Sequence, residues 1–272
     1  MLYKKDVKID NINDSRSIIF SMITPNSVVL DMGCACGDLA EQLVKIKKCK
    51  VYGLEYNPES VKKCHYLNVF EDVKQFDLNK LSSLSFTQYI GKFDYVIFGD
   101  ILEHLLSPST VLTISKTYLK PEGRFVISLP NLSHASIKTN LLLNDFTRTP
   151  LGILDNTHLH FFTYKNIASL LYNSKLNIKN INYTTLPFDG YQPHKIDELP
   201  NDIVKFIIND KHSAVFQYIL ECYTDDEVYF DSLLDTMNNL QITSCNENTV
   251  FKLKRYIMTK CPYIIKYLEK LR

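Results

Sequence analysis

The chain has 272 residues, of which 45% are hydrophobic and 22% are charged, and its net charge is +1. This size accommodates one large domain, or one domain with a substantial appendage. The balanced charge does not indicate nucleic-acid binding, no apolar run approaches the roughly 20 residues that span a bilayer, and the seven cysteines contain no C-x-x-C pair.

Residues 1–17 lack the apolar core of a signal peptide, so we expect a cytoplasmic protein with reduced cysteines. Charge is uneven near the C-terminus. Residues 188–248 carry twelve acidic and three basic side chains, whereas residues 251–272 carry seven basic side chains and one acidic one. This basic tail either makes a peripheral contact with an anionic membrane or packs on the acidic region or on a second subunit, as in a homodimer. We favour packing.

Strand-like and helix-like segments alternate along the first 130 residues. Short apolar runs predict strands, and apolar residues at helical spacing predict the helices between them. Strands are expected at residues 27–31, 50–55, up to 77, 93–98, 123–129, 177–185 and 214–220. Helices are expected at residues 39–46, from residue 58, and at 103–118, 164–174 and 199–210. Continuous apolar strands separated by helices are typical of a doubly wound α/β fold with a mostly parallel sheet.

A glycine-bearing turn, DMGCACG, follows the first predicted strand. Gly33 and Gly37 allow close approach of the backbone to a ligand, and the following helix offers its N-terminal amides. Glu55 ends the second strand, 24 residues after Asp31, where a carboxylate can accept both hydroxyls of a ribose. The glycine spacing is G-x-x-x-G rather than the G-x-G-x-x-G of dinucleotide-binding turns, and a tight turn without a ligand is the alternative.

Five segments together resemble the motifs of class I S-adenosylmethionine-dependent methyltransferases: VLDMGCACGDLAEQL, VYGLEYNP, FDLNKL, FDYVIFGDILEHL and LKPEGRFVISLPN. The resemblance implies a Rossmann-like, seven-stranded sheet with an antiparallel last strand, in a domain of residues 1–222. A surface insertion is expected at about 187–212, and an acidic-then-basic helical extension at 223–272. The implied cofactor is S-adenosylmethionine, held by Asp31, Gly33, Cys34, Gly37, Glu55, Tyr56, Asp77, Leu78 and Gly99. Ala35 stands where many members have glycine.

A second cluster of polar residues follows the fourth predicted strand, in GDILEHL. If a helix begins near Asp100, then Asp100, Glu103 and His104 lie on one face of it. Acids at a helix N-terminus also complement its dipole, which is the structural alternative.

Two further histidines, His158 and His160, alternate with apolar residues in GILDNTHLHFFT. In an extended segment, both histidines point to one side, while Leu159 and Phe161 pack on the sheet. A pair of buried structural histidines is an equally weighted alternative. Asn131 and His134 are placed near the pocket mouth, where we favour a helix-capping role for His134.

An alcohol nucleophile needs a base to remove its proton or a metal to lower its pKa. We predict Asp100, His104 and His158 as catalytic residues, and Asp100, Glu103, His104 and His158 as ligands of a divalent metal (Mg, Mn or Zn). The E-H…H pattern resembles small-RNA 2′-O-methyltransferases and quinone O-methyltransferases. Cys34 and Cys36 are read as small residues required by the turn.

LEHLLSP, SLPNLSHASIKTNLLLNDF and GILDNTHLHFFT resemble bacterial methyltransferases of glycan biosynthesis; the resemblance covers roughly residues 27–221. It implies O-methylation of a sugar hydroxyl in a glycan or a glycosylated small molecule. Two alternatives stay open: O-methylation of a small phenolic or quinone-like acceptor, and a non-catalytic module that only binds S-adenosylmethionine.

Overall fold

The computed structural model describes residues 9, 11–186 and 196–242 of the chain. Seven strands form one sheet in the order β3-β2-β1-β4-β5-β7-β6. The strands are β1 (Val28–Met32), β2 (Lys50–Glu55), β3 (Phe70–Gln75), β4 (Phe93–Gly99), β5 (Leu119–Pro130), β6 (Leu176–Thr185) and β7 (Val215–Thr224). Strands β1 to β5 pair in parallel, and β7 runs antiparallel to both β5 and β6. The predicted fold class and the antiparallel last strand are therefore confirmed.

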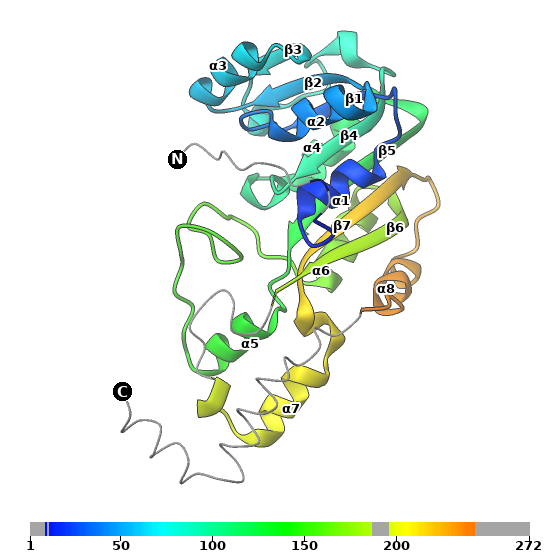
Figure 1. Ribbon diagram of the computed structural model, residues 1–272. Helices are drawn as coiled ribbons and strands as arrows, with labels where there is room; N and C mark the ends of the chain where they lie inside the picture. Colours follow the sequence, from blue (N-terminus) through cyan, green and yellow to red (C-terminus); the bar gives the residue numbers. More distant parts are fainter. Residues whose placement is uncertain (1–8, 10, 187–195, 243–272) are drawn as a thin grey trace.

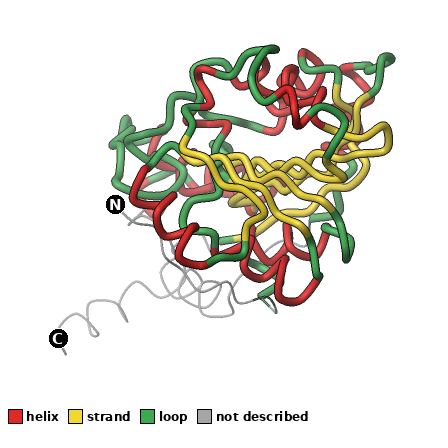
Figure 2. Tube along the Cα trace, turned by 90° about the horizontal axis from the view of Figure 1, so that it is seen from above, coloured by secondary structure: helices red, strands yellow, loops and turns green. Residues whose placement is uncertain are grey.

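Helices cover both faces of this sheet (Figures 1 and 2). The helices are α1 (Ser15–Met22), α2 (Asp38–Lys47), α3 (Pro58–Leu67), α4 (Pro108–Ser115), α5 (Ala135–Leu142), α6 (Tyr164–Asn173), α7 (Asn201–Asn209) and α8 (Phe230–Asn238). Helices α1 and α2 pack on one face, and α4, α6 and α8 pack on the other. Helices α5 and α7 contact each other and lie below the sheet in Figure 1.

Adjacent residues of the central strands are buried on opposite faces of the sheet. Val29 and Val126 join the core under α1 and α2, whereas their neighbours Leu30 and Phe125 join the core under α4 and α6. Side chains alternate between the faces of a strand, so a sheet covered on both faces needs apolar residues at every position. The burial on both faces explains why the sequence of these strands is continuously apolar.

The predicted continuous helix over residues 103–118 is wrong. A short 3₁₀ turn, η3 (Leu102–His104), ends before α4, and a second 3₁₀ turn, η4 (Lys116–Tyr118), follows α4. Pro108 causes the break, since it has no N–H for a helical hydrogen bond and disfavours a helical conformation of the residue before it. Ser107 accordingly has φ −138° and ψ 79°.

The described part of the C-terminal region belongs to the same core as the sheet. Leu233 and Met237 of α8 are fully buried in the core that includes β7. Residues 243–272, which hold the basic tail, and residues 187–195 of the expected insertion lie outside the described residues, so the domain boundaries stay predictions. Among the described residues, no helix is long and apolar enough to cross a membrane.

Candidate active site

The carboxyl ends of β1 and β4 form the place where the chain order reverses. These two strands pair in parallel, while β2 and β3 continue to one side of β1 and β5 to the other side of β4. In open α/β sheets, ligands bind outside such a reversal point. The glycine turn follows β1 and the η3 turn follows β4, so both predicted polar clusters lie at this edge.

The two glycines of the turn are required by the packing of the protein itself. Gly33 and Gly37 have φ values of +92° and +83°. A Cβ atom on Gly33 would lie 2.9 Å from the side chain of Ile101, and one on Gly37 would lie 2.9 Å from Phe70. Ala35, between them, has φ +49°, a left-handed conformation that glycine adopts at less cost.

The carboxylates predicted to contact the ribose and the adenine lie at the end of β2 and just after β3. The Oε2 atom of Glu55 accepts a hydrogen bond from the Ala35 N–H at 2.9 Å, and its Oε1 accepts one from the Asn57 N–H at 2.7 Å. A carboxylate has about four lone-pair positions, so acceptor capacity remains for two hydroxyls. Asp77 accepts from the Asn79 N–H at 3.0 Å, beside the buried Leu78.

The other residues predicted to bind the cofactor differ in how far their side chains are exposed to solvent. The buried Asp31 has its pKa raised to about 7, first by burial and then by the charge of Glu55. The side chain of Cys34 is buried against Gly53, so only its backbone can face a ligand. Tyr56 is largely exposed after β2, and Gly99 ends β4.

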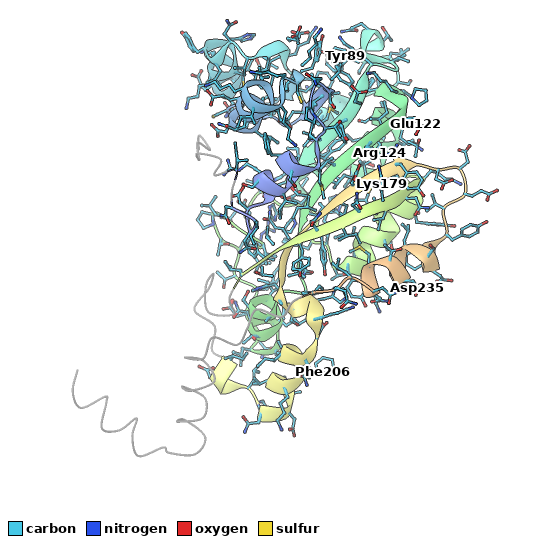
Figure 3. The ribbon with its side chains drawn as sticks, turned by 45° about the vertical axis from the view of Figure 1, so that its right-hand side comes forward. Tyr89, Glu122, Arg124, Lys179, Phe206 and Asp235 are labelled. Carbon is cyan, nitrogen blue, oxygen red and sulfur yellow. The ribbon has the colours of Figure 1, made fainter. Side chains whose placement is uncertain are left out.

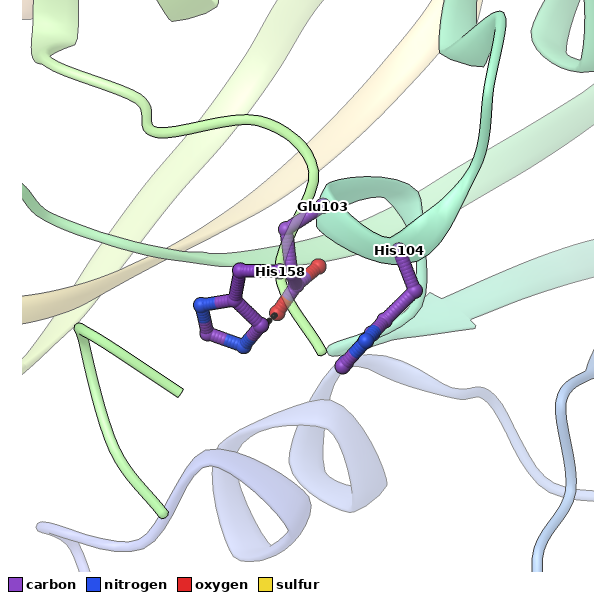
Figure 4. A group of neighbouring side chains, drawn as sticks. All are labelled: Glu103, His104 and His158. Atoms are coloured by element: carbon purple, nitrogen blue, oxygen red, sulfur yellow. Dashed lines mark ion pairs between the residues drawn. The ribbon is translucent and has the colours of Figure 1, made fainter. Parts of the chain in front are cut away.

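Glu103, His104 and His158 form one cluster, here called the acid–histidine group (Figure 4). Their potential ligand atoms all lie within 4.8 Å of one another. Glu103 is 1% exposed, its Oε1 lies 3.9 Å from Nε2 of His158, and its Oε2 has no hydrogen-bond partner in the part of the chain that the structure describes. Burial, and then the charge of Asp100, raise the pKa of Glu103 well above its usual range.

Hydrogen bonds to carbonyl oxygens determine which ring nitrogen of each histidine is free. Nδ1 of His158 lies 3.0 Å from the carbonyl oxygen of Ile153, and Nδ1 of His104 lies 3.2 Å from that of Thr157. A carbonyl only accepts, so Nδ1 carries the proton in each ring and Nε2 keeps a lone pair. Burial lowers the pKa of His158, which favours the neutral ring.

The donors of this group suit a divalent metal. Two imidazoles and one carboxylate are a common ligand set of catalytic metal sites. Histidine ligands typically donate their other ring N–H to a carbonyl or carboxylate, as both histidines do here. A bound cation would also offset the cost of the unpaired Glu103 oxygen. The residues therefore fit such an ion.

The segment with His158 and His160 arches over η3, but it is not extended. The N–H groups of Leu159 and His160 both donate to the carbonyl oxygen of Glu103, at 2.8 and 3.0 Å. His158 lies in a tight turn, where its N–H donates to the carbonyl oxygen of Asp155. Leu159 is 54% exposed, so its predicted packing on the sheet is wrong. His160 approaches the carbonyl oxygen of Leu106 at 3.4 Å and lies outside the acid–histidine group.

Asp100 lies beside the acid–histidine group rather than in it. Its φ is +52°, and its Oδ1 accepts from the Ser128 hydroxyl at 2.6 Å and from Gln217 Nε2 at 3.0 Å. The predicted one-face arrangement fails because no helix begins at Asp100. Asn131 is buried and donates to backbone carbonyls, and His134 caps α5, as expected.

Two arginines near the site were not predicted from the sequence. Arg148 donates to backbone carbonyls of the turn with His158. Arg16 of α1 lies 4.0 Å from Asp38, and its charge partly offsets the rise in the pKa of Asp100. Neither lies in a recognisable motif, because only the folded chain brings them to this edge.

Comparison with known proteins identifies the family and the fold. A family model described as "Methyltransferase domain" matches residues 12–180. The S-adenosylmethionine-dependent methyltransferase of Archaeoglobus fulgidus superposes with a TM-score of 0.52 at 17% identity, covering 78% of this chain and 96% of that one. This structural likeness establishes a shared fold.

Two curated relatives carry the name ubiquinone biosynthesis O-methyltransferase. The protein of Xanthomonas oryzae pv. oryzae is 26% identical over 155 residues, 56% of this chain and 64% of the relative. The human mitochondrial protein is 22% identical over 205 residues, 73% of this chain and 55% of the relative. The chain thus spans less than two thirds of the length of these relatives.

Proposed function

Because the chain belongs to the methyltransferase domain family, we propose that it uses S-adenosylmethionine to methylate a hydroxyl oxygen of a small phenolic or quinone-like acceptor. S-adenosylmethionine supplies the methyl group on a positively charged sulfur. The names of the two curated relatives support this acceptor class over the glycan expected from sequence resemblance. A non-catalytic binding module is the remaining alternative.

The observation that carries the proposal is the buried pairing of Glu103 with His158 at the carboxyl end of β4. Methyl transfer to a hydroxyl requires removal of its proton. A neutral imidazole has a lone pair that can accept this proton. His158 keeps a lone pair on Nε2 because Nδ1 donates to Ile153. Glu103 stabilises the positive charge that His158 gains with the proton only when Glu103 is ionised, and its raised pKa shifts that condition to higher pH.

Glu103, His104 and His158 would alternatively hold a Mg, Mn or Zn ion, which supplies a lowered pKa for an acceptor hydroxyl. In this version the same side chains orient the acceptor oxygen instead of removing its proton directly. In both the base mechanism and the metal-assisted mechanism, the reacting hydroxyl binds at the acid–histidine group. Removal of the metal with a chelator distinguishes the two mechanisms.

Aromatic side chains beside His158 favour a flat acceptor over a sugar. The ring of Phe161 lies 6.2 Å from the imidazole of His158, and the ring of Phe146 lies 5.5 Å from Phe161. Aromatic rings prefer edge-to-face or offset contacts at such distances, so a phenol can join this cluster.

The test is turnover of S-adenosylmethionine by the purified chain against catechols, hydroquinones, hydroxybenzoates and nucleotide sugars. We expect release of S-adenosylhomocysteine with phenolic acceptors, and a methyl ether in the product by mass spectrometry. Turnover with nucleotide sugars alone would contradict the phenolic proposal. Cofactor binding without turnover on any acceptor would favour the non-catalytic module.

A further inference from the structure

Arg148 braces the turn that carries His158. Its Nε and Nη2 atoms donate to the carbonyl oxygen of Asp155 at 3.1 and 2.7 Å, and Nη2 also donates to the carbonyl oxygen of His158 at 2.8 Å. All three hydrogen bonds reach backbone atoms. The guanidinium group therefore fixes the path of the chain at His158 itself.

The turn braced by Arg148 also supplies the partner of the His158 ring. The N–H of Thr149 donates to the carbonyl oxygen of Leu154, and the N–H of Asn156 donates back to that of Thr149, both at 2.8 Å. The carbonyl of Ile153, inside this loop, accepts from Nδ1 of His158. Movement of the loop relative to His158 would thus release the ring that presents Nε2 to Glu103.

Packing in a buried cluster also holds the loop, on its other side. Ile153 and Leu154 are buried in a cluster with Ile137 of α5. The guanidinium carbon of Arg148 lies 5.1 Å from the centre of the Phe161 ring, a cation–π distance. Loss of Arg148 should therefore loosen the His158 end of the loop while the buried cluster keeps the segment folded.

We propose that Arg148 is a positioning residue, which holds His158 against Glu103 for methyl transfer; this inference rests on the proposed function of the acid–histidine group. A lysine keeps the charge, but its single ammonium group cannot reproduce the planar fork that joins two carbonyls. Arg148→Lys should therefore hold the turn at His158 only in part.

The experiment compares Arg148→Gln and Arg148→Lys with Arg124→Gln as a matched control. Arg124 also donates to two backbone carbonyls and lies 5.8 Å from an aromatic ring, Tyr223. It lies in the middle of β5, near Glu122 (Figure 3), and not at the carboxyl end of the strand. Each full-length variant is measured for turnover, S-adenosylmethionine affinity, thermal unfolding and amide hydrogen exchange.

We expect Arg148→Gln to lower kcat by about 10- to 100-fold, the usual effect of removing a group that orients a ligand or base. The affinity for S-adenosylmethionine should stay unchanged, and the amides of Asn156 and His158 should exchange faster. Arg148→Lys should recover part of kcat, and Arg124→Gln should match the wild type in kcat and in exchange at these two amides.

Two results would overturn the inference. One is wild-type kcat and exchange in Arg148→Gln; the other is an activity loss that parallels loss of cofactor binding or global unfolding. Failure of the proposed function looks different, since wild-type protein would then turn over no phenolic acceptor. In that case the exchange of Asn156 and His158 still decides whether Arg148 holds this turn.

Discussion

The Nε2 atom of His158 lies 3.9 Å from the Oε1 atom of Glu103, and both side chains are more than nine-tenths buried. The second carboxylate oxygen of Glu103 has no partner among the described residues. A buried, incompletely paired carboxylate destabilises a fold, so its presence beside a neutral histidine indicates a group kept for chemistry rather than for stability.

Replacement of Glu103 tests this trade between stability and activity. We expect Glu103→Gln to lower kcat by about 100-fold or more, because the charge beside His158 is lost. The free energy of unfolding at pH 8 should rise by about 1 kcal/mol or more, because the buried charge is removed. Steady-state kinetics and urea unfolding check the two effects. Glu122→Gln, at a 94% exposed side chain, should change neither, and a less stable Glu103→Gln protein would contradict the prediction.

Metal removal separates the two versions of the chemistry. If the acid–histidine group holds a divalent ion, excess EDTA should abolish turnover, and Mg²⁺, Mn²⁺ or Zn²⁺ should restore it. His158→Asn should then weaken Mn²⁺ binding by about 10-fold or more in calorimetry, whereas His160→Asn should not, since His160 lies outside the group. Full activity in EDTA would leave His158 as the base and exclude the metal version.

The raised pKa of Asp31 predicts a pH dependence of stability. Its pKa is about 7 in the folded chain and about 3.9 when unfolded, so the folded state holds the proton more tightly between these values. Stability is therefore highest below about pH 4 for this group and is lost as pH rises through 7, by on the order of 4 kcal/mol.

Asp31→Asn removes this titration, so its stability advantage over the wild type should grow from pH 5 to pH 8. Urea unfolding at both pH values, without cofactor, measures the difference. Asp202→Asn, at a 95% exposed carboxylate, is the control and should follow the wild type. Parallel pH profiles of Asp31→Asn and wild type would show that Asp31 titrates normally.

Replacement of Ala35 by glycine should stabilise the folded protein. Its φ of +49° is left-handed, which costs an alanine about 1–2 kcal/mol, more than the entropy that a glycine adds to the unfolded chain. We expect Ala35→Gly to raise the free energy of unfolding by about 1 kcal/mol. Ala40→Gly, inside α2, should lower it by about 1 kcal/mol instead. Thermal and urea unfolding measure both, and a destabilised Ala35→Gly protein would refute the strain.

Local sequence patterns alone predicted the sheet, the glycine turn and the position of Glu103 and His104 after the fourth strand, whereas His158 was added from family resemblance. The first three features follow from local patterns, because buried parallel strands are apolar at every position and each strand end fixes where its loop begins. Motif resemblance added the cofactor, which the family match supports.

The directions of the side chains at this edge depend on the folded chain. Asp100 has a left-handed backbone conformation and begins no helix, and its carboxylate accepts from Ser128 and Gln217 instead of joining the acid–histidine group. The tight turn at His158 separates it from His160, and Arg148 meets that turn through backbone carbonyls that any sequence would offer. Such contacts join residues far apart in the chain and depend on backbone paths, which the local spacing of residue types does not specify.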